Sequence, residues 1–230
     1  MAYLLAIETA TKVCSVALFK DDKLLQVKEE KGAYSHAENL AEFTSQLLTE
    51  SNLDAKDLSG IVVSKGPGSY TGLRIGVSFA KGLCYSLKIP LISIDTIYAL
   101  ALGWVQAENP KVDLICPMID ARRMEVYSAI YNFDLKCLKP ISADVIEIDS
   151  YSELLQDKIA VFVGDGAEKC QSLLEGKNRT FRSDFLPSAA YLGKEGYHKY
   201  QQSKIEDVAY FEPYYLKEFV ALKSQKGSLD

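Results

Sequence analysis

The chain has 230 residues, 48% of them hydrophobic and 25% charged, which is an ordinary globular composition for one large domain or two small ones. Its net charge of −5 argues against an autonomous nucleic-acid-binding protein, because contacts to phosphates need an excess of lysine and arginine. We therefore expect any RNA that it serves to be held mostly by a partner.

Membrane and secretory proteins are also disfavoured. No apolar run approaches the roughly 18 residues of a membrane-spanning helix, and the N-terminal segment has no secretory signal pattern. Five cysteines lie far apart without a Cys-x-x-Cys pair, which is typical of free thiols in a reducing compartment. These features predict a cytoplasmic protein that does not contact a membrane.

The first half of the chain predicts three strands followed by alternating helices and strands. The strands are expected at 3–8, 13–19, 24–28, 60–64 and 91–94, and the helices at 36–51, 70–87 and 95–107. Ser35 is a suitable cap for the first of these helices. The polar stretch Ala107–Asp113 contains Asn-Pro and is the best candidate for a domain boundary. We therefore divide the chain into subdomains 1–108 and 109–230.

The second half repeats the beginning of the first. Segment Ile7–Phe19 aligns without gaps with segment Ile119–Tyr131, and Glu8 then lies over Asp120. Both segments read as strand, tight turn and strand, with the acid where the first strand ends. The better interpretation is an internal duplication.

A duplicated β-β-β-α-β-α-β-α unit with an acid at the end of its first strand resembles the actin-like ATPase superfamily (ASKHA, RNase H-like). The resemblance implies an α/β fold of two duplicated subdomains, the second one smaller, each a mixed sheet flanked by helices. In that superfamily the acid helps to hold metal-bound phosphate, and a glycine normally follows it. Here Ala10 stands in the first turn, and Arg122 and Arg123 stand in the second. Both departures argue against an efficient kinase.

Two roles remain open for each turn. In the first alternative Glu8 holds a metal-bound nucleotide. In the second it accepts hydrogen bonds from the backbone N–H groups of Thr9 and Thr11 and so caps its own turn. The Asp120 turn is either self-paired or a contact to a partner or nucleotide. Together with an arginine discussed below, the possible nucleotide or partner contacts are Glu8, Thr9, Thr11, Arg74, Asp120, Arg122 and Arg123.

Six stretches narrow the resemblance to one family. They are LLAIETAT (Leu4–Thr11), YSHAENL (Tyr34–Leu40), GPGSYTGLRIG (Gly66–Gly76), IPLISIDT (Ile89–Thr96), IDARRMEVY (Ile119–Tyr127) and EPYYLK (Glu212–Lys217). Together they resemble the bacterial TsaB (YeaZ) family, the partner subunit in making threonylcarbamoyladenosine next to the tRNA anticodon. The similarity covers nearly the whole chain and is densest up to residue 131.

That family implies a non-catalytic assembly subunit. It would bind a TsaD-type catalytic subunit and a TsaE-type ATPase subunit, form a homodimer when alone, and meet tRNA only through the complex. The catalytic relatives carry a His-x-x-x-His metal site shortly after a segment like Ile89–Ile94, where this chain has Thr96 and Leu100. We therefore expect no metal, no catalytic residue and no cofactor, and leave open an ATP or ADP at the subunit joint. The alternatives are a small-molecule kinase or ATPase of the actin-like class and a metalloprotease-like (glycoprotease) homologue.

The stretch KGPGSYTGLR (Lys65–Arg74) lies between a predicted strand and a predicted helix, where glycines either cradle phosphate or make a tight turn. It lacks the Gly-Lys-Ser/Thr ending of a P-loop. A structural turn capped by Ser69 or Thr71 is therefore favoured over a residual nucleotide contact. Arg74 lies in the first helical turn, where a cation opposes the helix dipole, so we expect it to meet an acid of this chain or of a partner. VGDGA (Val163–Ala167) resembles a shortened adenosine-side turn, but an ordinary turn is favoured.

The helix at 70–87 carries two apolar stripes. The stripe expected to pack on the sheet is Leu73, Val77, Ala80, Cys84 and Leu87. The second stripe is Gly72, Ile75, Gly76, Phe79 and Leu83. We predict that the second stripe forms a helix-to-helix partner interface beside helix 36–51, with the two glycines letting a partner helix come close. On that basis Gly76→Arg would abolish association and leave the fold intact. The alternative is that the second half of the chain covers this stripe.

Two further side chains are expected to be structural. His36 shares a face with apolar residues, which favours a partly buried residue at a helix start over a catalytic base. Trp104 is most simply a packing residue.

Overall fold

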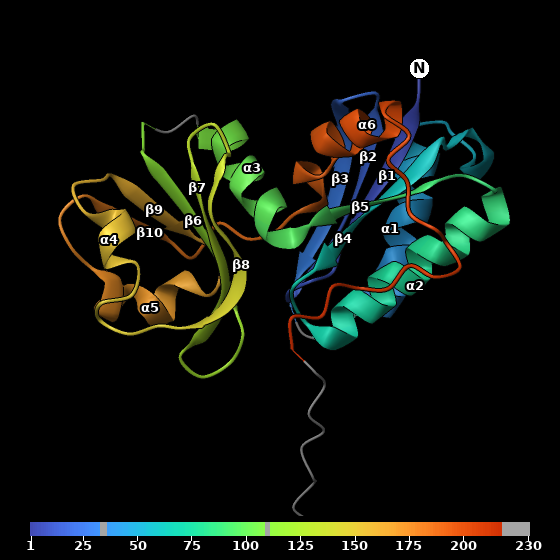
Figure 1. Cartoon of the computed structure of the whole chain (residues 1–230). Coiled ribbons are helices and arrows are strands. Elements are labelled where there is room, and N and C mark those ends of the chain that lie inside the picture. Colours follow the sequence, from blue (N-terminus) through green and yellow to red (C-terminus); the bar gives the residue numbers. More distant parts are fainter. Residues whose placement is uncertain (33–35, 109–110, 218–230) are drawn as a thin grey trace, which may run out of the picture.

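Within the residues that the structure describes, 1–32, 36–108 and 111–217, two five-stranded sheets form the framework of this computed structural model (Figure 1). The first half contains β1 (Tyr3–Glu8), β2 (Val13–Lys20), β3 (Lys23–Lys31), α1 (His36–Glu50), β4 (Gly60–Gly66), α2 (Tyr70–Leu87), β5 (Leu91–Asp95) and α3 (Thr96–Glu108). The second half contains β6 (Leu114–Asp120), β7 (Glu125–Asn132), β8 (Cys137–Val145), α4 (Ser152–Leu155), β9 (Ala160–Val163), α5 (Ala167–Leu174), β10 (Arg179–Arg182) and α6 (Gly193–Gln201). Ser35 and residues 109–110 of the expected boundary lie outside the described residues.

The two sheets have the same topology. The strand order is β3-β2-β1-β4-β5 in the first sheet and β8-β7-β6-β9-β10 in the second. In each sheet the first strand pairs antiparallel with the second and parallel with the fourth. The turns after Glu8 and Asp120 therefore occupy equivalent positions. This confirms the predicted fold class of two duplicated, mixed-sheet subdomains.

The halves exchange helices across their joint. Helix α3 of the first half packs on the second sheet through its buried residues Ile97, Leu100, Ala101 and Trp104. A short 3₁₀ helix (Ala189–Tyr191) and α6 return to the first sheet, where they cover Leu4, Ala6, Phe19 and Val62. The division at residue 108 stays a prediction, but residues 189–201, which it assigned to the second subdomain, lie on the first sheet (Figure 1).

Helices α1 and α2 cover the opposite face of the first sheet (Figure 1). The stripe expected to face the sheet does so, since Leu73, Val77, Ala80 and Cys84 are buried and Leu87 is half-buried. The alternating strand residues Leu5, Ile7, Val16, Leu18, Ile61 and Val63 supply the other side of this core. The large side chains in the second stripe of α2, Ile75, Phe79 and Leu83, are half-buried.

Two glycines of α2 are explained by the turn that follows β1. A Cβ atom at Gly72 would lie 2.1 Å from the carbonyl oxygen of Thr9, and one at Gly76 would lie 2.2 Å from Oγ1 of the same residue. The Thr9 hydroxyl donates a hydrogen bond to the Gly72 carbonyl at 2.8 Å. The close approach that we expected from a partner helix is thus made by this chain itself. Gly76→Arg is therefore expected to disrupt the fold, which corrects the expectation that it would leave the fold intact.

This packing predicts a large difference between two substitutions in one helix. Gly72→Ala should lower the free energy of unfolding by about 2 kcal/mol, because the methyl group overlaps a backbone carbonyl. Gly82→Ala is the matched control, since nothing lies within 4 Å of its added Cβ, and it should stabilise the helix by up to about 1 kcal/mol. Urea unfolding followed by circular dichroism measures both. Equal stabilities would show that the Thr9 contact does not constrain α2.

Candidate functional site

The glycine-rich loop lies directly on the turn after β1. A Cβ atom at Gly68 would lie 2.4 Å from the carbonyl oxygen of Ala10. The backbone N–H of Ser69 donates to the same oxygen at 2.7 Å, and the Ser69 hydroxyl accepts from the Gly72 N–H at 3.3 Å. The space beside Gly68 that a phosphate would need is therefore taken by Ala10. The geometry supports the structural turn, with Ser69 as the helix cap.

Glu8 is fully buried at the end of β1. Its Oε1 accepts a hydrogen bond from the Ala10 N–H at 2.6 Å, and the buried Ser64 hydroxyl and the Thr9 N–H lie close enough to lower its pKa. Burial raises the pKa of Glu8 to about 7, against the opposing effect of the backbone hydrogen bond. The expected capping of the turn is supported by the Ala10 N–H, with a smaller contribution from the Thr9 N–H, and the metal-nucleotide role stays a prediction.

The second turn is held by a lysine that sequence reasoning missed. Asp120 Oδ1 accepts from the Arg122 N–H at 2.8 Å and from Lys169 Nζ at 2.5 Å. Lys169 also donates to the carbonyl oxygens of Arg123 at 2.6 Å and Glu125 at 2.7 Å. Burial by itself raises the pKa of Asp120, but the hydrogen bonds from Lys169 and Arg122 lower it below its usual value. Asp120, the equivalent of Glu8 in the second half, is thus ionised, and the Lys169 ammonium of α5 balances its charge.

Arg122 and Arg123 contribute backbone groups, and no side-chain contact, to this pairing. Both residues have positive φ angles, 70° and 51°, and both are exposed. Neither forms an ion pair with another described residue. Asp165, in the Val163–Ala167 turn, accepts from the Asp120 N–H at 3.0 Å, so that turn supports the second hairpin.

The two turns lie within electrostatic range of each other. Burial raises the pKa of Asp165, and Lys12 of the β1–β2 turn opposes this shift from the other half. Lys12 also helps to lower the pKa of Asp120. The structure therefore brings the Glu8 and Asp120 turns close enough for Lys12 of the first turn to act on the acids of the second half.

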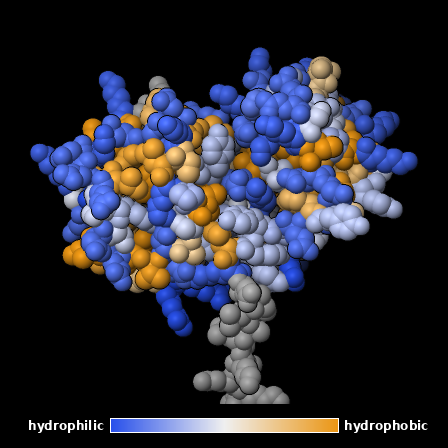
Figure 2. Space-filling view, in the orientation of Figure 1, coloured by the Kyte–Doolittle hydropathy of each residue, from blue (hydrophilic) through white to orange (hydrophobic). Residues whose placement is uncertain are grey.

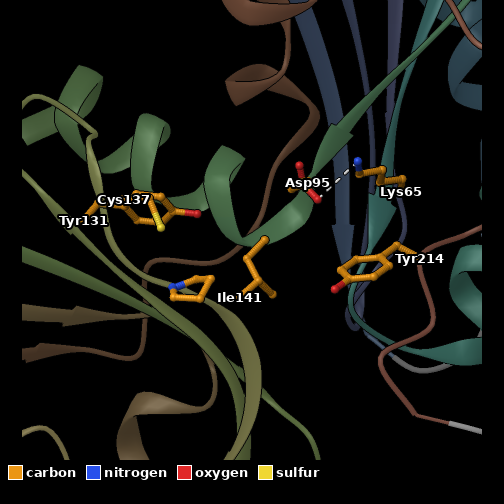
Figure 3. Close-up of a pocket in the computed structure, with 7 residues that line it drawn as sticks. Lys65, Asp95, Tyr131, Cys137, Ile141 and Tyr214 are labelled. Carbon is orange, nitrogen blue, oxygen red and sulfur yellow. Dashed lines mark ion pairs between the residues drawn. The ribbon is translucent and has the colours of Figure 1, made fainter.

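A pocket of about 330 Å³ opens between the halves (Figure 3). Lys65 and Asp95 lie at the ends of β4 and β5, and their ion pair measures 3.3 Å. Tyr214 stands on the same side, while Tyr131, Cys137, Pro140 and Ile141 of the second half face them (Figure 3). The Lys65 ammonium neutralises the acid of this pocket.

Arg74 is separated from both turns and lies on the outer side of α2. Its guanidinium lies over the Tyr70 ring at 4.3 Å, and its Nε donates to the Tyr215 hydroxyl at 3.3 Å. Among the described residues no acid lies within ion-pairing distance, so the expected intrachain partner is not found. Arg74 instead lines a surface groove of about 480 Å³ with Ala37, Leu40, Ile75, Ser78 and Phe79. Tyr215 belongs to the EPYYLK stretch, but no sequence signal connected it with Arg74.

The residues expected to be structural are confirmed. His36 is buried, and its Nε2 lies 3.0 Å from the Thr11 carbonyl, to which it donates. Burial lowers the pKa of His36. Trp104 is 4% exposed and packs edge-on against Phe185 at 5.1 Å.

The positions aligned with the metal site of the catalytic relatives serve the fold here. The Thr96 hydroxyl accepts from the Gly66 N–H at 3.1 Å, and Leu100 is fully buried. In the described part of the chain no three His, Cys, Asp or Glu side chains are grouped to hold a metal ion. The same part contains no helix of the length and apolarity that a membrane crossing requires.

Comparisons with known proteins agree on one family. The family model described as TsaD, tRNA N6-adenosine threonylcarbamoyltransferase, matches residues 27–210. The protein TsaB of Escherichia coli (strain K12), named for tRNA threonylcarbamoyladenosine biosynthesis, is 30% identical over 231 residues, covering 97% of this chain and 98% of its own. TsaB of Bacillus subtilis (strain 168) is 29% identical over 205 residues, which cover 88% of this chain and 84% of its own. The solved structure of YeaZ from Pseudomonas aeruginosa shares the fold, with a TM-score of 0.83, 23% identity, and coverage of 94% of this chain and 100% of its own.

The buried carboxyl of Glu8 predicts a specific pH dependence. Because its folded pKa of about 7 exceeds its ordinary value of 4.5, the folded state binds the proton more tightly, and stability falls as pH rises through this window. Glu8→Gln keeps the acceptor for Ala10 and removes the charge. Relative to the unmodified protein it should therefore gain up to about 3 kcal/mol between pH 5 and pH 8.

Urea unfolding at a series of pH values measures this difference. Glu42→Gln, at an exposed position of α1, is the control for removing one surface carboxylate. A stability difference between Glu8→Gln and the unmodified protein that does not change with pH would contradict the burial argument.

Proposed function

This chain belongs to the TsaB family, and we propose that it serves tRNA threonylcarbamoyladenosine biosynthesis as a non-catalytic subunit. It binds a TsaD-type catalytic subunit, works with a TsaE-type ATPase subunit, and forms a homodimer when alone. It acts in the cytoplasm and meets tRNA only through the complex, in keeping with its net charge of −5.

The observation that carries this proposal is the groove between α1 and α2. Its floor is apolar, made by Leu40 together with the half-buried Ile75 and Phe79. Both helices lie on the face of the first sheet that is remote from the second sheet, and the segment that follows α6 runs along α2 (Figure 1). That segment meets α2 at Lys81 and Arg74, and no described residue of the second half lines the groove beside α1. We place the interface on Ile75, Phe79 and Leu83, with Gly72 and Gly76 supporting it from inside.

The two turns support a subunit without a reaction of its own. Burial keeps Glu8 from solvent, and Lys169 occupies Asp120, so neither acid is free to hold metal-bound phosphate. These contacts weigh against the kinase alternative. Thr96 and Leu100 weigh against the metalloprotease alternative, because leucine offers no ligand atom. An ATP or ADP at the joint with the partner remains compatible with the exposed Arg122 and Arg123.

The interface is tested by co-purification with the TsaD-type subunit, with and without the TsaE-type subunit and ATP. Ser78 is exposed and lines the groove, so Ser78→Arg should leave the fold intact and weaken binding at least about 100-fold, because a bulky charge would be buried at the joint. Ser172→Arg, at an exposed position of α5 in the second half, is the matched control. Binding by a folded Ser78→Arg variant at unchanged affinity would remove the interface from this groove.

ATP binding tests the alternative enzyme function separately. The isolated chain should bind Mg-ATP with a dissociation constant weaker than about 1 µM, because Ala10 and Lys169 occupy the positions that phosphate would need. Titration calorimetry measures this. A tighter constant, or ATP turnover without the partner subunits, would favour a kinase or ATPase.

A further inference from the structure

The last described segment of the chain is a strap that crosses the first half. It begins at β5, where the Glu206 N–H donates to the Leu91 carbonyl at 2.8 Å. It then follows α2, where Lys81 Nζ donates to the carbonyl of Phe211 at 2.9 Å. At the joint the Tyr214 N–H donates to the Lys65 carbonyl at 2.7 Å. The strap is therefore an ordered part of the surface beside the groove.

The strap holds Arg74 in one position. The Tyr70 and Tyr215 rings lie 4.8 Å apart at an angle of 36°, and the guanidinium lies over the first of them. The Tyr215 hydroxyl accepts the Nε–H of Arg74. A guanidinium has five N–H donors, and this arrangement uses only the one on Nε. Within the described residues the four donors on the two Nη atoms have no hydrogen-bond or ion-pair partner.

This arginine lies near the N-terminal end of α2 with no acid among the described residues paired to it. It is the fifth residue of a helix that begins at Tyr70, so it lies just beyond the first turn, where repulsion of a cation by the helix dipole has largely fallen off. Glu212 of the strap acts on it electrostatically but forms no ion pair with it. The chain therefore orients the guanidinium with two tyrosines whose rings are tilted against each other, and in its described part leaves the charge without an ion-pair partner.

Docking of a partner in the groove would take water away from this charge, because Arg74 lines the groove with Ile75 and Phe79. A guanidinium buried without a partner is strongly destabilising, whereas a carboxylate can accept two parallel N–H bonds from its Nη edge. We propose that Arg74, positioned by Tyr70 and by Tyr215 of the strap, binds a carboxylate of the TsaD-type subunit at the rim of the α1–α2 groove. This inference rests on the proposed function and names the chemistry that the partner must present.

The test compares variants of Arg74 in binding to the purified TsaD-type subunit by titration calorimetry at two or more salt concentrations. Arg74→Met keeps the length of the side chain and should weaken binding by about 10- to 100-fold and flatten its salt dependence. Arg74→Lys should recover only part of the affinity, because an ammonium does not form the paired bonds. Tyr215→Phe should weaken binding a few-fold without touching the partner, as expected for a positioning residue.

Lys88→Met, at the exposed far end of α2, is the control for removing one cation from the same helix. Circular dichroism confirms that each variant is folded. If Ser78→Arg abolishes binding while Arg74→Met binds as tightly as the unmodified protein, the carboxylate inference fails and the proposed function stands. If neither variant changes binding, the groove itself is not the interface. An unchanged salt dependence in Arg74→Met would also overturn the inference.

Discussion

The contact between the turn after β1 and the first turns of α2 determines most of what this protein can do. Thr9 packs into the space left by Gly72 and Gly76, and Ala10 packs into the space left by Gly68. Because backbone carbonyl oxygens lie against Gly68 and Gly72 and the Thr9 side chain lies against Gly76, α2 has little freedom to rotate or shift. One consequence is that the apolar side chains Ile75 and Phe79 face outward beside α1. Another is that the loop that resembles a phosphate cradle is filled by the chain itself.

The two halves reach the same result by different electrostatic means. In the first half the acid at the end of β1 is buried, and its raised pKa reflects the cost of holding a charge away from water. In the second half the acid at the end of β6 stays charged, and the Lys169 ammonium balances it. Both acids then stabilise their own turns. An actin-like enzyme would need at least one of them free for metal-bound phosphate, and this difference supports the role of a partner subunit.

The exchange of helices explains why the duplicated halves form one body. Helix α3 completes the core of the second sheet, and the segment from Ala189 to the end of α6 completes the core of the first. Each half thus buries apolar surface that the other supplies. The strap then continues from α6 over α2 to the joint, and Lys217 pairs with Glu125 of the second half. The strap therefore contacts the groove through Arg74 and Tyr215, and the second half through Lys217 and Glu125.

The sequence alone determined the elements of the first half, the duplication and the family. Hydrophobic periodicity placed the helices and strands of the first half to within a few residues, because burial of one face leaves a regular pattern. The repeated segments at Glu8 and Asp120 indicated the twofold fold, and the six motifs indicated the TsaB family. Periodicity also separated the stripe of Leu73 and Val77 from that of Ile75 and Phe79.

Only the tertiary structure decided which groups meet. A sequence pattern shows that Gly72 and Gly76 admit a close neighbour, but Thr9 approaches them through the packing of β1 against α2. No local signal linked Lys169 to Asp120 or Tyr215 to Arg74. The first pair meets because β9, which precedes α5, lies beside β6. The second meets because the segment after α6 runs back along α2. The periodicity of apolar residues in a segment indicates which of them are buried, whereas the residues that they contact depend on the path of the whole chain. For that reason the proposed partner surface was predictable as a stripe of residues on one helix, whereas the contact between Arg74 and Tyr215 was not.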